Sequence, residues 1–266
     1  MINQKLETQK QWNNRPCGQI GDITYTLDYF LEVEKYRYQI EVPFMTETYP
    51  FYETTNKGKK ILEIGYGQGT DHAQFASSGA EMYGVDLTET HFQLAKLNFE
   101  LRGLKGNFLL QDASNLPYED NFFDTIYSFG VLHHTPDIDV CIKEAYRVLK
   151  PGGKIILSFY YKHSAFHWYK KIFIDYILKL GFITKGYDGV LSTIEAGADG
   201  IHIKPLVILY DKKMMRNVLS EFKEVSIQIK HLTPPQLPIL GKLLPDFIFK
   251  KLEPIFGWYI IGEAYK

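Results

Sequence analysis

The sequence has few cysteines and no long apolar run. Cys17 and Cys141 are the only cysteines among 266 residues, and their separation fits neither a metal-ligand motif nor a redox motif. We therefore expect no metal site, and a reducing, cytoplasmic setting. No apolar stretch is long enough to span a bilayer, so we expect no stable membrane insertion.

An excess of one charge is also missing. The chain carries 30 Lys and Arg against 31 Asp and Glu, so it lacks the positive field that draws proteins onto nucleic acid. Nucleic acid is therefore not an expected partner. Aromatic residues, in contrast, are abundant at 15%, and they supply flat apolar surfaces for a core or a binding pocket.

Between Lys60 and Tyr161, short apolar runs alternate with amphipathic stretches, which is typical of βα units that build a parallel sheet. The expected strands cover residues 60–64, 81–85, 106–110, 123–129 and 154–160. The expected helices cover residues 70–78, 89–102 and 137–149, with a helix stop and turn at Lys150-Pro151-Gly152-Gly153. Strands at 224–232 and 258–265 are expected to close the sheet as an antiparallel pair.

The segments around this core are less regular. Apolar spacing predicts helices at 28–41, 165–180 and 211–222, whereas the glycine-rich stretch 181–205 shows no period and is expected to lie over the sheet as an insertion. Residues 237–252 are amphipathic. We expect them to form a packed surface helix or a homodimer contact, with contact to a membrane or a lipid-like acceptor as the alternative.

These patterns predict a Rossmann-like α/β fold, with a mostly parallel seven-stranded sheet, helices on both faces and an antiparallel last strand. We expect residues 1–56 to form an N-terminal cap segment that includes a cap helix. Residues 57–266 are expected to form the main domain. An insertion after the fifth strand, at about 162–210, is expected to form a roof over the substrate.

The strongest motif is Glu63-Ile64-Gly65-Tyr66-Gly67-Gln68-Gly69-Thr70, which follows the first expected strand and opens the first helix. Its glycines let the backbone turn and pass close to a ligand, and free N–H groups face that ligand at the start of the helix. The dinucleotide fingerprint places its third glycine one position later. The spacing therefore favours a different nucleotide cofactor.

Two acidic residues follow at the ends of the next strands. Asp86, followed by Leu87, can accept hydrogen bonds from both hydroxyls of a ribose, with a helix cap as the alternative. Asp112, followed by Ala113, comes after the third strand, and a turn-forming aspartate is the alternative there.

The fourth strand continues into Phe129-Gly130-Val131-Leu132-His133-His134, and a helix then leads to Leu149-Lys150-Pro151-Gly152-Gly153. In this order and spacing, the four motifs resemble the class I S-adenosylmethionine-dependent methyltransferases. The resemblance is to the small-molecule branch, which includes ubiquinone-biosynthesis and natural-product tailoring enzymes. It implies S-adenosylmethionine as cofactor and S-adenosylhomocysteine as product.

The resemblance also implies roles for individual residues. Glu63, Gly65, Gly67 and Gly69 would surround the methionyl part and the ribose, Asp86 and Leu87 the ribose, and Asp112 and Ala113 the adenine, with Phe129 and Leu132 beside the cofactor. Tyr66 departs from the family pattern, which usually has a small residue there. The helix at 28–41 resembles a cap helix, in which Arg37 would bind the methionine carboxylate and Tyr29 would cover the sulfonium. A surface-exposed arginine and a packed tyrosine are equally open alternatives.

If the acceptor is a hydroxyl or an ammonium group, a base must remove its proton. His134 and then His133 are the preferred candidates, although one of such a pair often points inward to shape the loop. Further candidates are His163, His167 and His202. Aromatic side chains that include Tyr161, Phe166, Trp168 and Tyr187 are expected in the roof of the acceptor pocket.

We thus expect methyl transfer to an oxygen or nitrogen atom of a small aromatic or hydrophobic molecule, such as a secondary metabolite, with carbon still open. One alternative is a non-catalytic protein that binds S-adenosylmethionine. A second is an NAD(P)-dependent oxidoreductase, which the glycine spacing disfavours.

Overall fold

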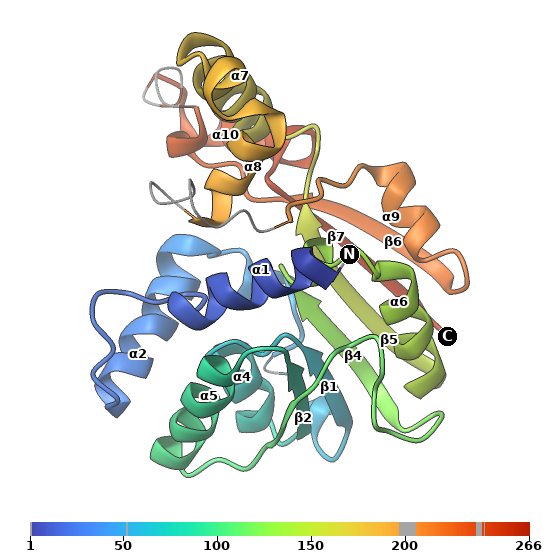
Figure 1. The fold of residues 1–266 in the computed structure, drawn as a ribbon. Helices are drawn as coiled ribbons and strands as arrows, with labels where there is room; N and C mark the ends of the chain where they lie inside the picture. Colours follow the sequence, from blue (N-terminus) through green and yellow to red (C-terminus); the bar gives the residue numbers. More distant parts are fainter. Residues whose placement is uncertain (1, 52, 197–205, 238–240, 242) are drawn as a thin grey trace.

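A seven-stranded sheet in the order β3-β2-β1-β4-β5-β7-β6 forms the centre of the protein (Figure 1). The computed structural model describes residues 2–51, 53–196, 206–237, 241 and 243–266. The strands are β1 (Lys60–Ile64), β2 (Glu81–Asp86), β3 (Asn107–Leu110), β4 (Phe123–Phe129), β5 (Leu149–Tyr160), β6 (Lys223–Lys230) and β7 (Tyr259–Tyr265). Strands β1 to β5 are parallel, and β7 lies antiparallel between β5 and β6. The predicted fold class is confirmed.

Helices cover both faces of the sheet, because alternate side chains of each strand point to opposite sides. Leu62 and Ile126 belong to a core that includes residues of α6 and α9, whereas Ile61 and Tyr127 belong to a second core on the other face, which includes Phe75 of α4. The helices next to the sheet are α4 (Thr70–Ser77), α5 (Glu89–Arg102), α6 (Ile138–Val148) and α9 (Lys212–Val218). Helices α4, α5 and α6 lie within one residue of the predicted limits, whereas α9 ends four residues before the predicted residue 222.

The predicted turn at Lys150-Pro151-Gly152-Gly153 is wrong, because β5 begins at Leu149 and includes these residues. Leu149 pairs with Phe123 of β4, and the register shifts before Thr125. The Gly152 N–H donates to the Lys266 carbonyl, and the Lys266 N–H donates to Gly153. Pairing with the far end of the chain therefore keeps this segment within the strand, although Gly152 has a left-handed φ of +75° at the irregularity.

The insertion is more regular than predicted. It contains a π-helix, η4 (Phe166–Leu178), followed by α7 (Gly181–Thr184) and α8 (Gly186–Ala196). The prediction of an irregular segment from residue 181 is therefore wrong as far as residue 196, because α8 packs its buried Val190 and Leu191 inward. His202 lies outside the described residues.

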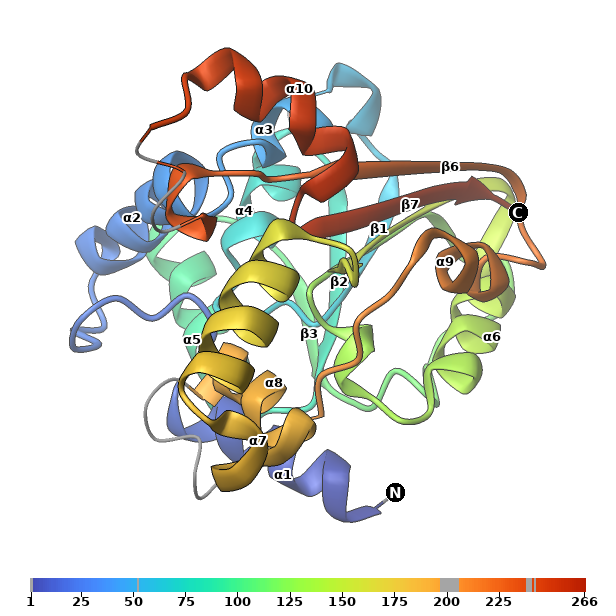
Figure 2. The same cartoon turned by 90° about the horizontal axis from the view of Figure 1, so that it is seen from above.

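The N-terminal part contains α1 (Ile2–Asn14), α2 (Leu27–Tyr36), the π-helical turn η1 (Arg37–Glu41) and α3 (Met45–Thr48). Helix α1, which the sequence pattern did not indicate, packs on α5 and runs beside α8 (Figure 2). Helix α10 (Asp246–Phe256) packs on β6. None of the helices in the described part of the chain has the length and apolar character needed to cross a membrane.

Candidate functional site

An open cavity lies at the carboxyl ends of β1, β2 and β4, with an empty volume of about 1370 Å³ that includes part of the open mouth. Strand β1 has β2 on one side and β4 on the other, so the chain reverses its order here, and such switch points are where open α/β sheets bind ligands. Most residues predicted to bind the cofactor line it: Arg37, Glu63, Gly65, Gly67, Asp86, Leu87, Asp112, Ala113, Phe129 and Leu132.

The glycine-rich loop after β1 forms the floor of the cavity. Gly65 and Gly67 line it with φ values of +79° and +53°. Gly69 does not line it, because it starts α4 and packs against Ala95 of α5. The bulky Tyr66 is accommodated because its ring lies against Gly84 and Phe108 and its hydroxyl donates to the Leu109 carbonyl.

Replacement of Gly65 with alanine is expected to destabilise the protein. A Cβ atom there would lie 2.3 Å from Val131 Cγ2, in addition to the strain of a φ value of +79°. Strain and overpacking together predict a loss of about 2–4 kcal/mol in the free energy of unfolding, measured in urea. Gly58→Ala is the matched control, because Gly58 has a φ of +74° but open space at the Cβ position. An equal loss in the free energy of unfolding for Gly65→Ala and Gly58→Ala would mean that the collision with Val131 contributes nothing.

Asp86 anchors the loop from the end of β2. Its Oδ2 accepts hydrogen bonds from the Gly67 N–H at 3.1 Å and from His91 Nδ1 at 3.1 Å, and its Oδ1 accepts from Thr88. The Cys17 N–H donates to His91 Nε2, so the ring proton of neutral His91 lies on Nδ1. Burial alone would raise the pKa of Asp86, but His91 and Thr88 outweigh it and lower the pKa below its ordinary value. Asp86 is therefore a carboxylate that faces the cavity.

Asp112 is joined to α1 by an ion pair. Lys5 Nζ lies 2.9 Å from Asp112 Oδ2 and 2.6 Å from Asp137 Oδ2. Burial raises the pKa of Asp112, but the bonds from Lys5 and Ser114 lower it overall. The oxygen predicted to accept from the adenine amino group thus has Lys5 as its partner in this structure.

Arg37 belongs to a buried network around Asp71. Its Nε and Nη2 donate to the two carboxylate oxygens of Asp71 at 2.7 and 2.6 Å, and Nη1 lies 3.6 Å from Glu41 Oε2. The hydroxyls of Tyr38 and Tyr127 donate to the same carboxylate. Arg37 lines the cavity, and its side chain binds Asp71 rather than lying exposed on the surface.

Glu63 and His72 form a second buried pair behind the glycine loop. Glu63 Oε2 lies 2.9 Å from His72 Nδ1. Burial raises the pKa of Glu63 well above its ordinary value and lowers the pKa of His72 to about 3. The stable form of the pair is therefore neutral, with the proton on Glu63.

The structure does not support a contact between Tyr29 and the sulfonium. Tyr29 is buried between α2 and α5, outside the cavity lining, and its hydroxyl donates to Gln68 Oε1 at 2.9 Å. The open alternative of a packed tyrosine is the one observed.

The prediction of which aromatic residues surround the acceptor pocket is also wrong. Tyr161, Phe166, Trp168 and Tyr187 do not line the cavity. Tyr161 and Phe166 pack into the core, Trp168 is exposed, and the Tyr187 hydroxyl contacts His167. The aromatic residues that do line it are Trp12, Tyr66, Phe129, Tyr160 and Tyr259.

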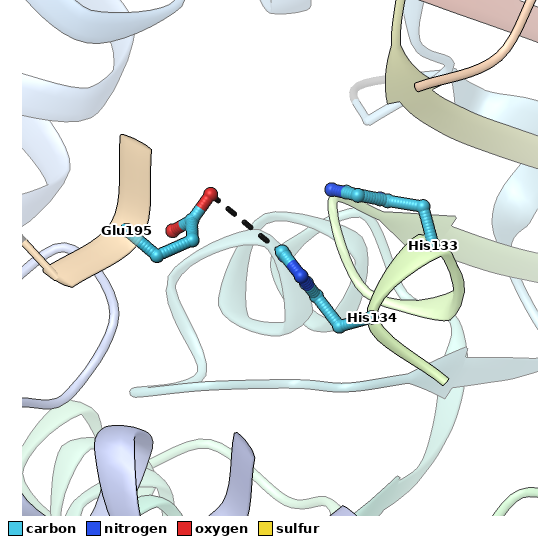
Figure 3. A group of neighbouring side chains, drawn as sticks. All are labelled: His133, His134 and Glu195. Carbon is cyan, nitrogen blue, oxygen red and sulfur yellow. Dashed lines mark ion pairs between the residues drawn. The ribbon is translucent and has the colours of Figure 1, made fainter. Parts of the chain in front are cut away.

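His134 lines the cavity, whereas His133 is fully buried beside it (Figure 3). His134 Nδ1 donates to the Leu206 carbonyl at 2.6 Å, so the lone pair of its neutral ring lies on Nε2, 3.8 Å from Glu195 Oε1. The two ring nitrogens of His133 have no hydrogen-bond partner, and burial lowers the pKa of His133 well below its ordinary value. His134 is therefore better placed than His133 to remove a proton from an acceptor, and His133 packs behind it, against His134 and Tyr160.

The other histidine candidates lie elsewhere. His163 is exposed, and His167 binds the Lys162 carbonyl and the Tyr187 hydroxyl, so neither lines the cavity. His133, His134 and Glu195 each offer one possible metal ligand atom, and these atoms lie within 4.8 Å of one another.

Four lining residues that bear on function were missed by the sequence prediction: Lys5, Trp12, Tyr160 and Glu195. Lys5 and Trp12 lie on α1, whose polar sequence gives no apolar stripe. Glu195 lies in the segment predicted to be irregular. Tyr160 ends β5 and was assigned only to the strand, although the carboxyl end of a parallel strand is itself a signal for a ligand site.

Comparisons with known proteins agree with this geometry. The profile of a family described as a methyltransferase domain matches residues 62–157. Ubiquinone biosynthesis O-methyltransferase from Coxiella burnetii is 32% identical over 128 residues, which cover 48% of this chain and 55% of that protein. Methyltransferase GfsG from Streptomyces halstedii is 29% identical over 71% of this chain and 63% of its own length. The chain thus spans between about half and two thirds of the length of these curated relatives.

A solved structure shows how far the fold extends. Haemonchus contortus phosphoethanolamine N-methyltransferase 2, in complex with phosphomonomethylethanolamine and S-adenosylhomocysteine, aligns with a TM-score of 0.61 at 16% identity. The alignment covers 97% of this chain and 60% of that one, so the shared fold includes the flanking segments. Residues 62–157 therefore match a methyltransferase domain, and the sheet order and the cavity at the switch point agree with that match.

Proposed function

We propose that the protein transfers a methyl group from S-adenosylmethionine to an oxygen or nitrogen atom of a small apolar or aromatic molecule. The observation that carries the proposal is the cavity at the switch point. There Gly65, Gly67, Asp86 and Asp112 surround one continuous space, and aromatic side chains complete it.

The cavity fits the cofactor in shape and charge. A side chain at Gly65 would collide with Val131, so the loop can approach a ligand closely only with glycine there. Asp86 would accept from the ribose hydroxyls, and Asp112 with the Ala113 amide would meet the adenine. The Arg37–Asp71 network and Glu63 would border the methionyl part. Bound S-adenosylmethionine supplies a methyl group on a positively charged sulfur, and that carbon–sulfur bond breaks as the acceptor's lone pair bonds the carbon.

The protein's own contribution is alignment, exclusion of water and removal of a proton. His134 is positioned for the last task, because the bond to Leu206 fixes the ring with the Nε2 lone pair free. Side chains of His134 and Glu195 are only 4% and 8% exposed, so this part of the cavity is sheltered from bulk water.

Calorimetric titration with S-adenosylmethionine, S-adenosylhomocysteine, NAD and NADP tests the proposal. We expect saturable binding of the first two, because the glycine spacing and the lining acids suit a ribose without a pyrophosphate. Binding of NAD or NADP instead, or of none of the four, would sink the proposal. Binding without methyl transfer to any hydroxylated or amino aromatic would favour the non-catalytic alternative.

Further proposals concern the flanking segments, the location of the protein and its assembly. We propose that residues 1–56 act as a cap segment and that the insertion at 162–210 supplies the acceptor side of the cavity. The cytoplasmic location and a homodimer remain predictions from the sequence.

A further inference from the structure

Glu195 is the one acidic side chain that the insertion contributes, within the described residues, to the cavity wall. Its Oε1 accepts a hydrogen bond from the Tyr160 hydroxyl at 2.5 Å and lies 3.8 Å from His134 Nε2 (Figure 3). His134 Nε2 has no hydrogen-bond partner, although its ring is buried. Glu195 Oε1 and His134 Nε2 thus face each other without a hydrogen bond between them, and a buried polar atom without a partner is unfavourable.

The rest of the cavity supplies no cation to this carboxylate. Among the described lining residues the only lysine and arginine are Lys5 and Arg37. Lys5 bridges Asp112 and Asp137, and Arg37 is held by both oxygens of Asp71. An anionic acceptor would therefore find no free positive partner in this lining and would face Glu195.

Aromatic rings complete the surroundings of this carboxylate. The ring of Trp12 lies 6.0 Å from that of His134, and Tyr160 stacks on Trp258 behind it. Aromatic faces attract a cation and also accommodate a flat apolar body.

We propose that Glu195, with His134, Tyr160 and Trp12, forms an acceptor subsite for an amine on an aromatic or apolar body. The ammonium form binds between Glu195 and His134, and donates hydrogen bonds to Glu195 Oε1 and His134 Nε2. This gives His134 Nε2 a hydrogen-bond partner and gives Glu195 a cationic partner in addition to the Tyr160 hydroxyl. It also places the acceptor nitrogen beside His134 Nε2, the atom that removes its proton. The inference rests on the proposed function, because it assigns the acceptor for that same cavity.

Binding to the protein saturated with S-adenosylhomocysteine tests this subsite. The probes are phenethylamine, phenethyl alcohol and phenylacetate, which share a ring and a two-carbon chain but differ in charge. We expect phenethylamine to bind at least about tenfold more tightly than phenylacetate, with the alcohol between them. Glu195→Gln should abolish the preference for the amine and leave the affinity for S-adenosylhomocysteine unchanged. Asp188→Asn is the matched control, because it removes an exposed negative charge from the same helix, α8.

Three results would overturn the inference. They are equal binding of amine and carboxylate, no binding of phenethylamine, and an amine preference that survives Glu195→Gln. A metal ion at His133, His134 and Glu195 would satisfy the same groups in another way. Stoichiometric Zn²⁺ binding that excludes phenethylamine and is reversed by EDTA would therefore also count against it. Failure of S-adenosylhomocysteine to bind the unmodified protein would instead contradict the proposed function.

Discussion

Replacement of Asp86 with alanine is expected to weaken the binding of S-adenosylhomocysteine by about 100- to 1000-fold, because two hydrogen bonds to a charged group are lost. Asp86 would accept from the ribose hydroxyls, and it also holds the Gly67 N–H and His91 in place. The variant therefore loses both a ligand contact and the shape of the loop. Calorimetry measures the affinity, and circular dichroism shows whether the variant is folded.

Asp124→Ala is the matched control. Asp124 is the second residue of β4, at the opposite end of the parallel strands. It binds the Lys60 N–H and Lys150, and its pKa is lowered like that of Asp86. The Asp124→Ala variant should be somewhat less stable than the unmodified protein and should bind S-adenosylhomocysteine with unchanged affinity. If both variants bind S-adenosylhomocysteine equally well, Asp86 does not hold the ribose.

Arg37→Met is expected to lower the free energy of unfolding by about 3–5 kcal/mol, because it leaves a buried carboxylate without its charged partner. Asp71 would keep the hydroxyls of Tyr38 and Tyr127, which cannot neutralise its charge. Urea denaturation measures the loss.

Two further variants show whether the loss comes from the unpaired charge of Asp71. The double variant Arg37→Met with Asp71→Asn should recover part of the stability, because the unpaired charge is gone. Lys10→Met removes the exposed ion pair with Glu7 and should cost at most about 1 kcal/mol. A loss for Arg37→Met no larger than that of Lys10→Met would mean that the network contributes little.

The parallel part of the fold could be predicted closely because each element carries its own periodic signal. Strands β1 and β4 and helix α5 have the predicted limits. The segment Lys150–Gly153 could not be predicted, because its place in β5 depends on hydrogen bonds with Lys266, more than a hundred residues away. Local turn preference was overridden by tertiary pairing.

The site residues that belong to a sequence motif could be predicted, whereas the site residues that come from the flanking helices could not. Gly65, Asp86 and Asp112 follow strand ends, and the sequence pattern shows where strands end. Helix α1 packs largely through hydrogen bonds, such as those from Gln9 to the Leu87 carbonyl and from Thr90 to Asn13, so it has no apolar stripe to reveal it. Glu195 was missed for a related reason, because glycines at both ends of α8 suggested a loop.

The position of β7 has a consequence for how the sheet is completed during synthesis. Strand β6 pairs only with β7 in the described sheet, although it is made earlier by the ribosome. Residues 223–230 therefore cannot join the sheet until residues 259–265 have left the exit tunnel and paired with β5. Until then the edge of β5 and the apolar side chains of β6 stay exposed, so a nascent chain stalled in this interval would be prone to aggregation.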